Sequence, residues 1–347
     1  MIKEAIIKLA CSENLSFGEA QETFKEIFEH KATLTQIAAF LTALKIKGET
    51  EEEIYAAATI VRRYAHKIKV RGDFVGIEIE DEPIMDTCGT GGSGVNKFNI
   101  STVVAFIVAA SGVKVAKHGN RAMSSNCGSA DVLEALGIKI DVSPLVMEEA
   151  IKKIGIGFLY APLYHPALKE VAQVRKDLGI RTIFNILGPL CNPASVTHQL
   201  LGVYDKDLVL TLAKVLANLK VKKAFVFHGK DLKDEISLTG ETFAAFLNNN
   251  RIEKLSLRPS EFGLKKVALK DLEVKDVNES AKIINNILDG KYGPTRDIAL
   301  ANASPCFYIL GKSKNLKEGA RLAASLIDEG KAKNKFLEFK NFIDTHK

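Results

Sequence analysis

Residues 84–112 read IMDTCGTGGSGVNKFNISTVVAFIVAASG, which is an apolar run, a loop with four glycines and an apolar helix in succession. Glycines let a backbone turn through positive φ and approach a ligand closely, and the successive N–H groups of such a turn can bind an anion. The helix, which opens at Asn99 and ends at Gly112, would add the positive end of its dipole. The loop lacks the Gly-Lys-Ser/Thr ending of a Walker A motif and the spacing of a dinucleotide-binding loop. It fits a phosphate-binding turn between a strand and a helix, and it also fits a tight turn that binds nothing.

Downstream of this loop, short apolar runs alternate with helical stretches. Runs such as 113–115 and 224–227 have the length of buried strands. This alternation is typical of an α/β domain with a central, mostly parallel sheet flanked by helices. The helical stretches between the runs cover residues 101–111, 129–136 and 207–218.

Upstream of the loop, the sequence has a purely helical pattern. A break at residues 70–73 separates the two patterns, so we predict a small N-terminal helical domain at 1–72 and a larger α/β domain at 73–347. A cleft between the two is where a ligand site is expected. Three pairs match the capping box that starts a helix, Ser16 with Glu19, Thr33 with Gln36 and Thr50 with Glu53.

The composition narrows the class of protein. With 347 residues, 46% of them hydrophobic, the chain can bury a large core and is not disordered. A net charge of +6 suits small anionic substrates as well as nucleic acid. The five cysteines form no CxxC pair, which predicts reduced thiols in a cytosolic protein and neither zinc nor disulfides. The N-terminal stretch mixes charged with apolar residues, so we expect no signal peptide, no membrane span and a cytoplasmic location.

Polar and charged side chains crowd residues 117–125, KHGNRAMSS, just past an apolar run. Lys117 and Arg121 could pair with phosphate oxygens, and Asn120 could orient a polar substrate. A polar surface loop would have the same composition. Binding is favoured because the segment follows the glycine loop by one βα unit, which places both at the carboxyl edge of the sheet. A lone histidine such as His118 is more often a structural or orienting group than a general base.

An adjacent pair of carboxylates, Asp234 and Glu235, follows the apolar run near residue 227. Carboxylates at the mouth of a sheet suit Mg²⁺, which takes oxygen ligands and often bridges substrate phosphates. The hydroxyl of Ser101 could be a further Mg²⁺ ligand, a phosphate contact or a helix cap. A solvated acidic turn is the alternative for the pair. Arg175 and Arg181 are either grips for a substrate carboxylate or surface charges.

Seven segments follow one another along the chain: GTGG at 89–92, FNIST at 98–102, KHGNR at 117–121, GSADVLEALG at 128–137, YHPA at 164–167, LGIRTIFNILGPL at 178–190 and DEIS at 234–237. Together, and in this order, these segments resemble the anthranilate phosphoribosyltransferase family. The resemblance implies a small helical domain, completed by helices near residues 165–180, and a larger α/β domain that binds phosphoribosyl pyrophosphate (PRPP). It also implies a homodimer that associates through the helical domains and Mg²⁺ that is carried in with the pyrophosphate.

The resemblance implies a specific reaction. The 5-phosphoribosyl group of PRPP would pass to the amine of anthranilate, with release of pyrophosphate, in tryptophan biosynthesis. One rival is a non-catalytic relative that binds nucleic acid, but it should have a strongly basic groove and degraded site motifs. Another rival is a pyrimidine nucleoside phosphorylase, which would not be expected to carry KHGNR, NILGP or the acidic pair. We therefore expect small-molecule substrates and neither a nucleic-acid nor a membrane partner.

Carried over residue by residue, the resemblance implies four sets of site residues. The catalytic residues would be Lys117, Asn120 and Arg175. The anthranilate contacts would be Gly89, Asn120 and Arg175, with Arg175 facing the carboxylate. The Mg²⁺ ligands would be Ser101, Asp234 and Glu235. The PRPP contacts would be Gly89, Gly92, Ser93, Lys97, Asn99, Ile100, Ser101, Thr102, Lys117, His118, Gly119, Asn120, Arg121, Ala122, Met123, Ser124, Ser125 and Ser129.

The chain departs from the family's usual pattern in a few places. Ser93 stands where Asp is usual, and Lys97 stands where Thr is usual. Gln173 stands where Pro is common, and residues 231–235 read DLKDE in place of DGLDE. None of these departures removes a residue that the expected chemistry requires.

Overall fold

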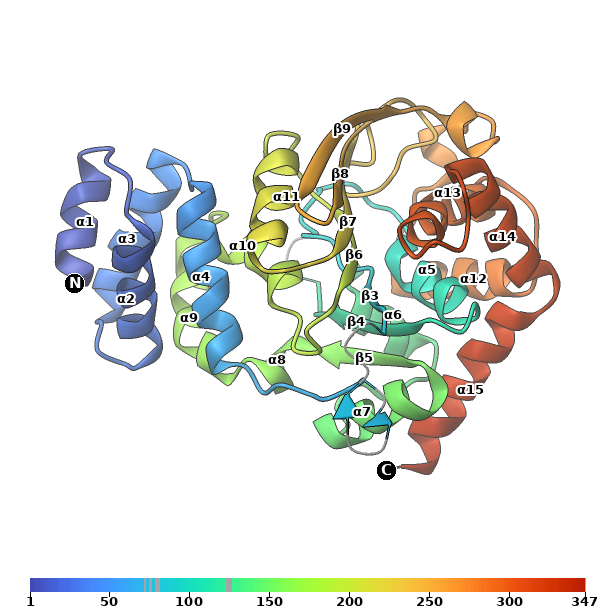
Figure 1. The fold of residues 1–347 in the computed structure, drawn as a ribbon, viewed down its shortest axis with the longest axis horizontal. Coiled ribbons are helices and arrows are strands. Elements are labelled where there is room, and N and C mark those ends of the chain that lie inside the picture. Colours follow the sequence, from blue (N-terminus) through green and yellow to red (C-terminus); the bar gives the residue numbers. More distant parts are fainter. Residues whose placement is uncertain (72, 75–76, 79–81, 123–126, 347) are drawn as a thin grey trace.

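The protein is described here by a computed structural model, which covers residues 1–71, 73–74, 77–78, 82–122 and 127–346. The N-terminal helices lie at one end of the molecule and the C-terminal helices at the other, with a sheet between them (Figure 1). Within the described residues, no helix is both long and apolar enough to cross a membrane.

The N-terminal bundle forms from helices whose starts are fixed by their own side chains. All three expected capping boxes are present, at Ser16, Thr33 and Thr50. Gly48, at a φ of 91°, ends the third helix as expected. The helices are α1 (Ile2–Ala10), α2 (Phe17–Phe28), α3 (Leu34–Lys47) and α4 (Glu51–Tyr64).

A later part of the chain returns to this bundle. Of its short helices, α9 packs against α3, while α10 and η2 pack against α4. Val171 and Val174 of α9 join the bundle's apolar core. These elements are α8 (Ala161–Tyr164), η1 (Pro166–Leu168), α9 (Lys169–Leu178), α10 (Phe184–Leu187) and η2 (Gly188–Cys191).

The sheet has seven strands in the order β5-β4-β3-β6-β7-β8-β9. Neighbours from β5 to β7 are parallel, and β7, β8 and β9 are antiparallel. The chain passes from β3 to β4 on one side and later adds β6 on the other, so the topology switches at β3, where open sheets bind ligands. The strands are β3 (Ile84–Asp86), β4 (Lys114–Gly119), β5 (Ile156–Tyr160), β6 (His198–Gly202), β7 (Lys223–Gly229), β8 (Thr242–Asn248) and β9 (Arg251–Leu257).

Successive side chains of each strand point to opposite faces of the sheet, so the apolar core is divided between the two faces. Phe225 and Phe227 of β7 pack into the cluster on the C-terminal side, whereas Ala224 and Val226 join the cluster shared with the bundle. The helices of the α/β part are α5 (Ile100–Ala109), α6 (Ser129–Ala135), α7 (Pro144–Ile154), α11 (Leu208–Asn218), α12 (Val277–Leu288), α13 (Pro294–Ile309), α14 (Leu316–Asp328) and α15 (Lys331–Thr345), with η3 (Pro259–Phe262) and η4 (Leu269–Asp271).

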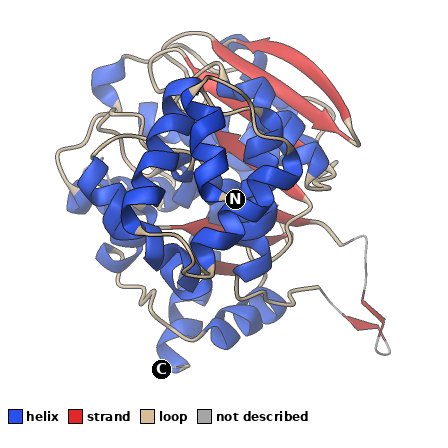
Figure 2. Ribbon diagram, turned by 90° about the vertical axis from the view of Figure 1, so that its left-hand side faces the viewer, coloured by secondary structure: helices blue, strands red, loops and turns tan. Residues whose placement is uncertain are grey.

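The fold class expected from the sequence is confirmed: a helical bundle beside a larger α/β unit with a mostly parallel sheet. The antiparallel β8–β9 hairpin was not anticipated, although its turn residues, Asn249 and Asn250, both have the positive φ that a two-residue hairpin turn requires. This hairpin forms one edge of the sheet (Figure 2). A separate antiparallel pair, β1 (Asp73–Phe74) with β2 (Ile77–Glu78), projects from the body (Figure 2).

Candidate active site

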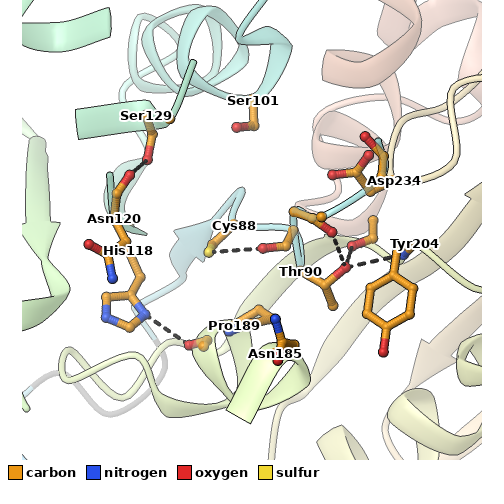
Figure 3. Close-up of a pocket in the computed structure, with 18 of the residues that line it drawn as sticks. Cys88, Thr90, Ser101, His118, Asn120, Ser129, Asn185, Pro189, Tyr204 and Asp234 are labelled. Atoms are coloured by element: carbon orange, nitrogen blue, oxygen red, sulfur yellow. Dashed lines mark hydrogen bonds between the residues drawn. The ribbon is translucent and has the colours of Figure 1, made fainter. Parts of the chain in front are cut away.

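A cavity of about 270 Å³ lies where the carboxyl ends of the parallel strands face the returning helices of the bundle. It is lined by the glycine loop, the ends of β4, β6 and β7, and residues of α9 and α10 (Figure 3). Of the residues expected from the sequence, those that line it are Gly89, Gly92, Ser93, Lys97, Asn99, Ser101, Lys117, His118, Gly119, Asn120, Arg121, Ala122, Ser129, Arg175, Asp234 and Glu235.

The glycine loop is pinned to the end of the neighbouring strand β6. The backbone N–H of Thr90 donates to the carbonyl of Gly202 at 2.9 Å, and the Thr90 hydroxyl accepts from the N–H of Tyr204 at 3.1 Å (Figure 3). Gly91 and Gly92 have positive φ values of 63° and 70°. The loop therefore crosses the switch point of the sheet in a conformation that favours glycine.

A buried carboxylate, Asp86, ties the start of this loop to two other segments. Its oxygens accept from the backbone N–H of Cys88 (3.0 Å) and of His118 (3.2 Å), and from the side chain of Asn192 (2.7 Å). Asn192 also donates to the carbonyl of Ala116 at 2.8 Å. Burial raises the pKa of Asp86 to about 6. These contacts hold the ends of β3 and β4 together at the floor of the cleft.

Helix α5 begins behind the loop and is capped by Asn99. The Asn99 side chain accepts from the N–H and the hydroxyl of Thr102 (3.3 and 2.6 Å) and from the Ser101 hydroxyl (3.4 Å). Among the roles left open for Ser101, capping is therefore wrong. The Ser101 hydroxyl faces the cleft and accepts from the ammonium of Lys117 at 3.0 Å. Two expected PRPP contacts, Ile100 and Thr102, are buried and do not line the cavity.

Lys117, His118 and Gly119 lie within β4 itself, and not beyond an apolar strand as the sequence indicated. Charged residues at a strand end were interpreted as a loop, whereas here they continue the ladder with β5. His118 is buried, and its Nδ1–H donates to the carbonyl of Gly188 at 2.9 Å (Figure 3). Burial lowers the pKa of His118 to about 4, so its ring is neutral near pH 7.

The segment after β4 is bound to helix α6 through Arg121 and Asn120. The Arg121 guanidinium forms two hydrogen bonds to Glu134, at 2.6 and 2.7 Å, and one to Asp131 at 3.1 Å. Its charge is therefore already paired at the rim of the cavity. The carbonyl of Asn120 accepts from the hydroxyl of Ser129 at 3.4 Å, which joins the segment to the start of α6 (Figure 3). The expected contacts Met123, Ser124 and Ser125 lie outside the described residues.

The acidic pair sits on a loop that is seated closely on the sheet. A side-chain carbon at Gly202 would lie 1.9 Å from the carbonyl oxygen of Asp234, so only glycine allows this approach. The buried side chain of Asn302 binds both the N–H (2.9 Å) and the carbonyl (3.2 Å) of Ile236. Burial raises the pKa of Glu235 to about 8, with Asp234 adding to the rise. The ammonium of Lys97 donates to Asp234 at 2.6 Å.

Two arginines enter the cavity from the helical side. Arg175, in the last turn of α9, is half-buried with its guanidinium 5.7 Å from the ring centre of Phe184, and burial lowers its pKa. Arg181 stacks at 4.4 Å on the ring of Tyr204 and donates to the carbonyl of Gly92. Arg181 thus braces the glycine loop, whereas no protein acid is paired with Arg175 among the described residues.

Comparison with known proteins places nearly the whole chain in the family that the sequence motifs resemble. Residues 3–65 match the model of the glycosyl transferase family, helical bundle domain, and residues 81–333 match that of the glycosyl transferase family, a/b domain. The anthranilate phosphoribosyltransferase of Geobacter sp. (strain M21) is 50% identical over 337 residues, which is 96% of each chain. The chain belongs to the anthranilate phosphoribosyltransferase family. The expected enzyme class, a glycosyltransferase of tryptophan biosynthesis, is confirmed.

Solved structures of the family have the same fold. The anthranilate phosphoribosyltransferase from Thermus thermophilus superposes with a TM-score of 0.90 at 37% identity, covering 98% of this chain and 99% of that one. The enzyme from Saccharomyces cerevisiae, in complex with PRPP and Mg, gives 0.87 at 29% identity over 99% and 98% of the chains. Its complex with 4-fluoroanthranilate gives 0.85 at 28% identity with the same coverage.

Some residues that build the anthranilate phosphoribosyltransferase site were missed from the sequence. Asp86 and Asn192 act together across 106 positions, and Asn302 reaches the acidic loop from α13. A buried asparagine carries no local signal of its partner. Asn192 follows the NILGP segment and Asp86 precedes the glycine loop, so both stand beside recognised motifs. Nothing in either stretch shows that their side chains form a hydrogen bond.

Proposed function

We propose that this chain transfers the 5-phosphoribosyl group of PRPP to the amine of anthranilate within this cleft. The observation that carries the proposal is that the two ends of a single cavity present different chemical groups. One end has the glycine loop, Ser101 and Lys117, which suit a polyanion, and the helical wall has Arg175, which suits a carboxylate. The binding of PRPP with Mg, and of 4-fluoroanthranilate, by the yeast relative supports this choice of ligands.

The donor set beside the glycine loop fits Mg²⁺. Asp234, Glu235 and Ser101 offer hard oxygen ligands in one cavity, and Mg²⁺ is usually bound by one or two carboxylates together with substrate phosphates. The raised pKa of Glu235 means that its ionised form needs more positive charge than the protein provides. We therefore assign Mg²⁺ to these three residues, where it would supply positive charge to the leaving pyrophosphate.

The protein's own groups act on the same leaving charge. Breaking the bond between ribose C1 and the pyrophosphate oxygen develops negative charge on that oxygen. Lys117 is 4% exposed, and in such a dry site its ammonium stabilises the developing charge more than it would in water. The N–H groups of the loop around Gly89 and Gly92 add fixed dipoles that need no reorganisation.

Anthranilate would lie between the loop and the helical wall. Arg175 would bind its carboxylate, with Asn120 and Gly89 beside it, so that the amine faces C1 and the encounter becomes an oriented one. An aromatic amine is a weak base with an available lone pair, so no protein base is assigned. His118 is neutral, with its Nδ1–H engaged by Gly188, and is assigned an orienting role.

Turnover by the purified chain tests the proposal. Product fluorescence, or loss of anthranilate, would be followed with PRPP and Mg²⁺ and again after removal of the metal with EDTA. Metal-dependent formation of phosphoribosyl-anthranilate and pyrophosphate is expected. A folded protein without turnover would overturn the proposal, and titration with single-stranded DNA and phosphorolysis of thymidine would then separate the two rival functions.

A further inference from the structure

Lys97 enters the pyrophosphate end of the cleft from a segment whose backbone is fixed. It forms an isolated antiparallel bridge with Glu273, and the carbonyl of Asn96 accepts from the N–H of Val274 at 3.2 Å. The next residue, Phe98, is fully buried. The start of the lysine side chain is therefore anchored, and only its flexible stem and ammonium can move.

The Lys97 ammonium makes three contacts inside the cleft. It donates to the carboxylate of Asp234 at 2.6 Å, to the hydroxyl of Ser93 at 3.0 Å and to the carbonyl of Leu232 at 3.2 Å. The side chains of Lys97 and Asp234 are only 9% and 10% exposed, so solvent screens this ion pair weakly.

These contacts place the positive charge of the ammonium against a carboxylate oxygen that the proposed function assigns to Mg²⁺. Lysine is a compact point charge on a flexible stem. It can leave one acceptor while it keeps the neutral partners Ser93 and Leu232. A metal ion and the ammonium would repel each other if both contacted the same carboxylate oxygen.

We propose that Lys97 is an exchangeable counter-cation of the acidic pair. Without substrate, its ammonium neutralises Asp234 and opposes binding of free divalent cations. When pyrophosphate arrives with its metal, the metal takes Asp234 and the ammonium turns to a pyrophosphate oxygen. The site then gains metal and pyrophosphate together, and free metal alone is disfavoured. This inference rests on the assignment of Asp234 and Glu235 as metal ligands.

The test measures binding with two separate probes. Mn²⁺ binding to the substrate-free protein is followed by electron paramagnetic resonance, and pyrophosphate binding in EDTA is followed by calorimetry. Lys97→Met should bind Mn²⁺ about tenfold or more tightly, because a repelling charge is removed from a poorly screened site. The same variant should bind metal-free pyrophosphate about tenfold more weakly, because a charge-assisted hydrogen bond is lost.

Opposite changes for the two probes are the signature, since local damage to the fold would weaken both. Lys230→Met is the matched control, because Lys230 is an exposed lysine on the same loop as the acidic pair. It should change both affinities little. Adding Asp234→Asn to Lys97→Met should remove the gain in Mn²⁺ affinity. If Lys97→Met is unstable, Lys97→Gln keeps a donor for Ser93 and should give the same signs.

An unchanged Mn²⁺ affinity in the Lys97 variants, or a gain that survives Asp234→Asn, would overturn the exchange. Turnover of the unaltered chain separates this failure from failure of the proposed function. An active, Mg²⁺-dependent enzyme whose Lys97 variants bind Mn²⁺ normally would keep the function and lose only the role of Lys97.

Discussion

Arg175 is the side chain to which the proposed function assigns recognition of the substrate carboxylate. It lines the cavity, it is half-buried, and its guanidinium lies 5.7 Å from the centre of the neutral ring of Phe184. We predict that Arg175→Ala raises the KM for anthranilate by about 10- to 100-fold, the worth of a charge-assisted hydrogen-bonded pair. Steady-state kinetics with each substrate varied in turn would check this.

The neighbouring Lys176→Ala is the control, because it removes an exposed cation from the same helix. Its KM values should stay near those of the unaltered chain. A loss confined to PRPP in Arg175→Ala would contradict the assigned role.

As a proposed metal ligand, Glu235 should couple metal binding to pH. Burial raises its pKa from 4.5 to about 8, so below that pH the metal-free carboxyl holds a proton that a metal ion must displace. Apparent Mn²⁺ affinity should therefore rise about tenfold per pH unit as the pH approaches 8, and it should level off above this value. Calorimetry in buffers of different ionisation enthalpy should show release of about one proton per metal ion near pH 7.

Glu235→Gln cannot exchange that proton, so its weaker Mn²⁺ binding should lose the pH dependence over this range. A slope that persists in Glu235→Gln would assign the proton to another group.

The two departures from the family pattern near the glycine loop are in contact with each other. The ammonium of Lys97 donates to the hydroxyl of Ser93, so an acid is absent and a base is present at adjoining places. Both differences make this end of the cleft more positive. From the sequence, Ser93 and Lys97 were separate anomalies, because nothing in their spacing shows that the two side chains meet or that Lys97 reaches Asp234.

At the scale of elements, the acidic loop depends on the glycines against which it packs. A Cβ at Gly202, at the end of β6, would lie 1.9 Å from the carbonyl oxygen of Asp234, and one at Gly229 would lie 2.3 Å from that of Glu235. We predict that Gly202→Ala displaces the loop and lowers Mg²⁺-dependent turnover at least about tenfold, because small misplacements of site residues are costly. Turnover measured against Mg²⁺ concentration would check this.

Gly18→Ala makes the same chemical change on α2, where no atom other than those of its chain neighbours and of the helix backbone lies within 4 Å of the added carbon. It should leave turnover unchanged and stabilise the protein by about 0.5–1 kcal/mol in urea unfolding, the usual gain for replacing a helical glycine. Normal Mg²⁺ dependence in Gly202→Ala would show that the loop tolerates the shift.

Elements whose signals are local could be predicted from the sequence, and contacts between distant elements could not. The capping boxes at Ser16, Thr33 and Thr50 need only four consecutive residues, and all three form. The cavity gathers the glycine loop, Lys117 and the acidic pair because parallel strands end at one edge. The partner of Asp86 and the pairing of Arg121 with Glu134 depend on the packing of the whole chain.

At the scale of the molecule, the bundle and the sheet share one apolar core. Residues of α4, α9, α11 and β7 lie in the same cluster. The side chain of Arg62 in α4 donates to the carbonyl of Leu190 in η2 at 2.6 Å. The helical wall that carries Arg175 is therefore built on the same core as strand β7, which leads into the acidic loop.

The far end of the bundle bears apolar side chains that the chain itself does not cover. Ile7 of α1 is 65% exposed and Ile46 of α3 is 82% exposed, and these two helices pack together at the end of the molecule away from the sheet (Figure 1). A homodimer through the helical bundles would bury this surface. We predict that light scattering gives twice the chain mass of 37.9 kDa, and that Ile7→Glu with Ile46→Glu shifts it toward the monomer, because buried unpaired charges oppose association.

Leu145→Glu is the matched control, since Leu145 is 74% exposed on α7, in the α/β part of the chain. It should leave the mass at the dimer value. Because the cavity is lined by residues of this one chain, a monomeric double variant should keep its Mg²⁺-dependent turnover. A monomeric unaltered chain would contradict the predicted dimer, and a dimer that survives both charges would place the interface elsewhere. A folded monomer without activity would instead mean that association supports the helical wall on which Arg175 stands.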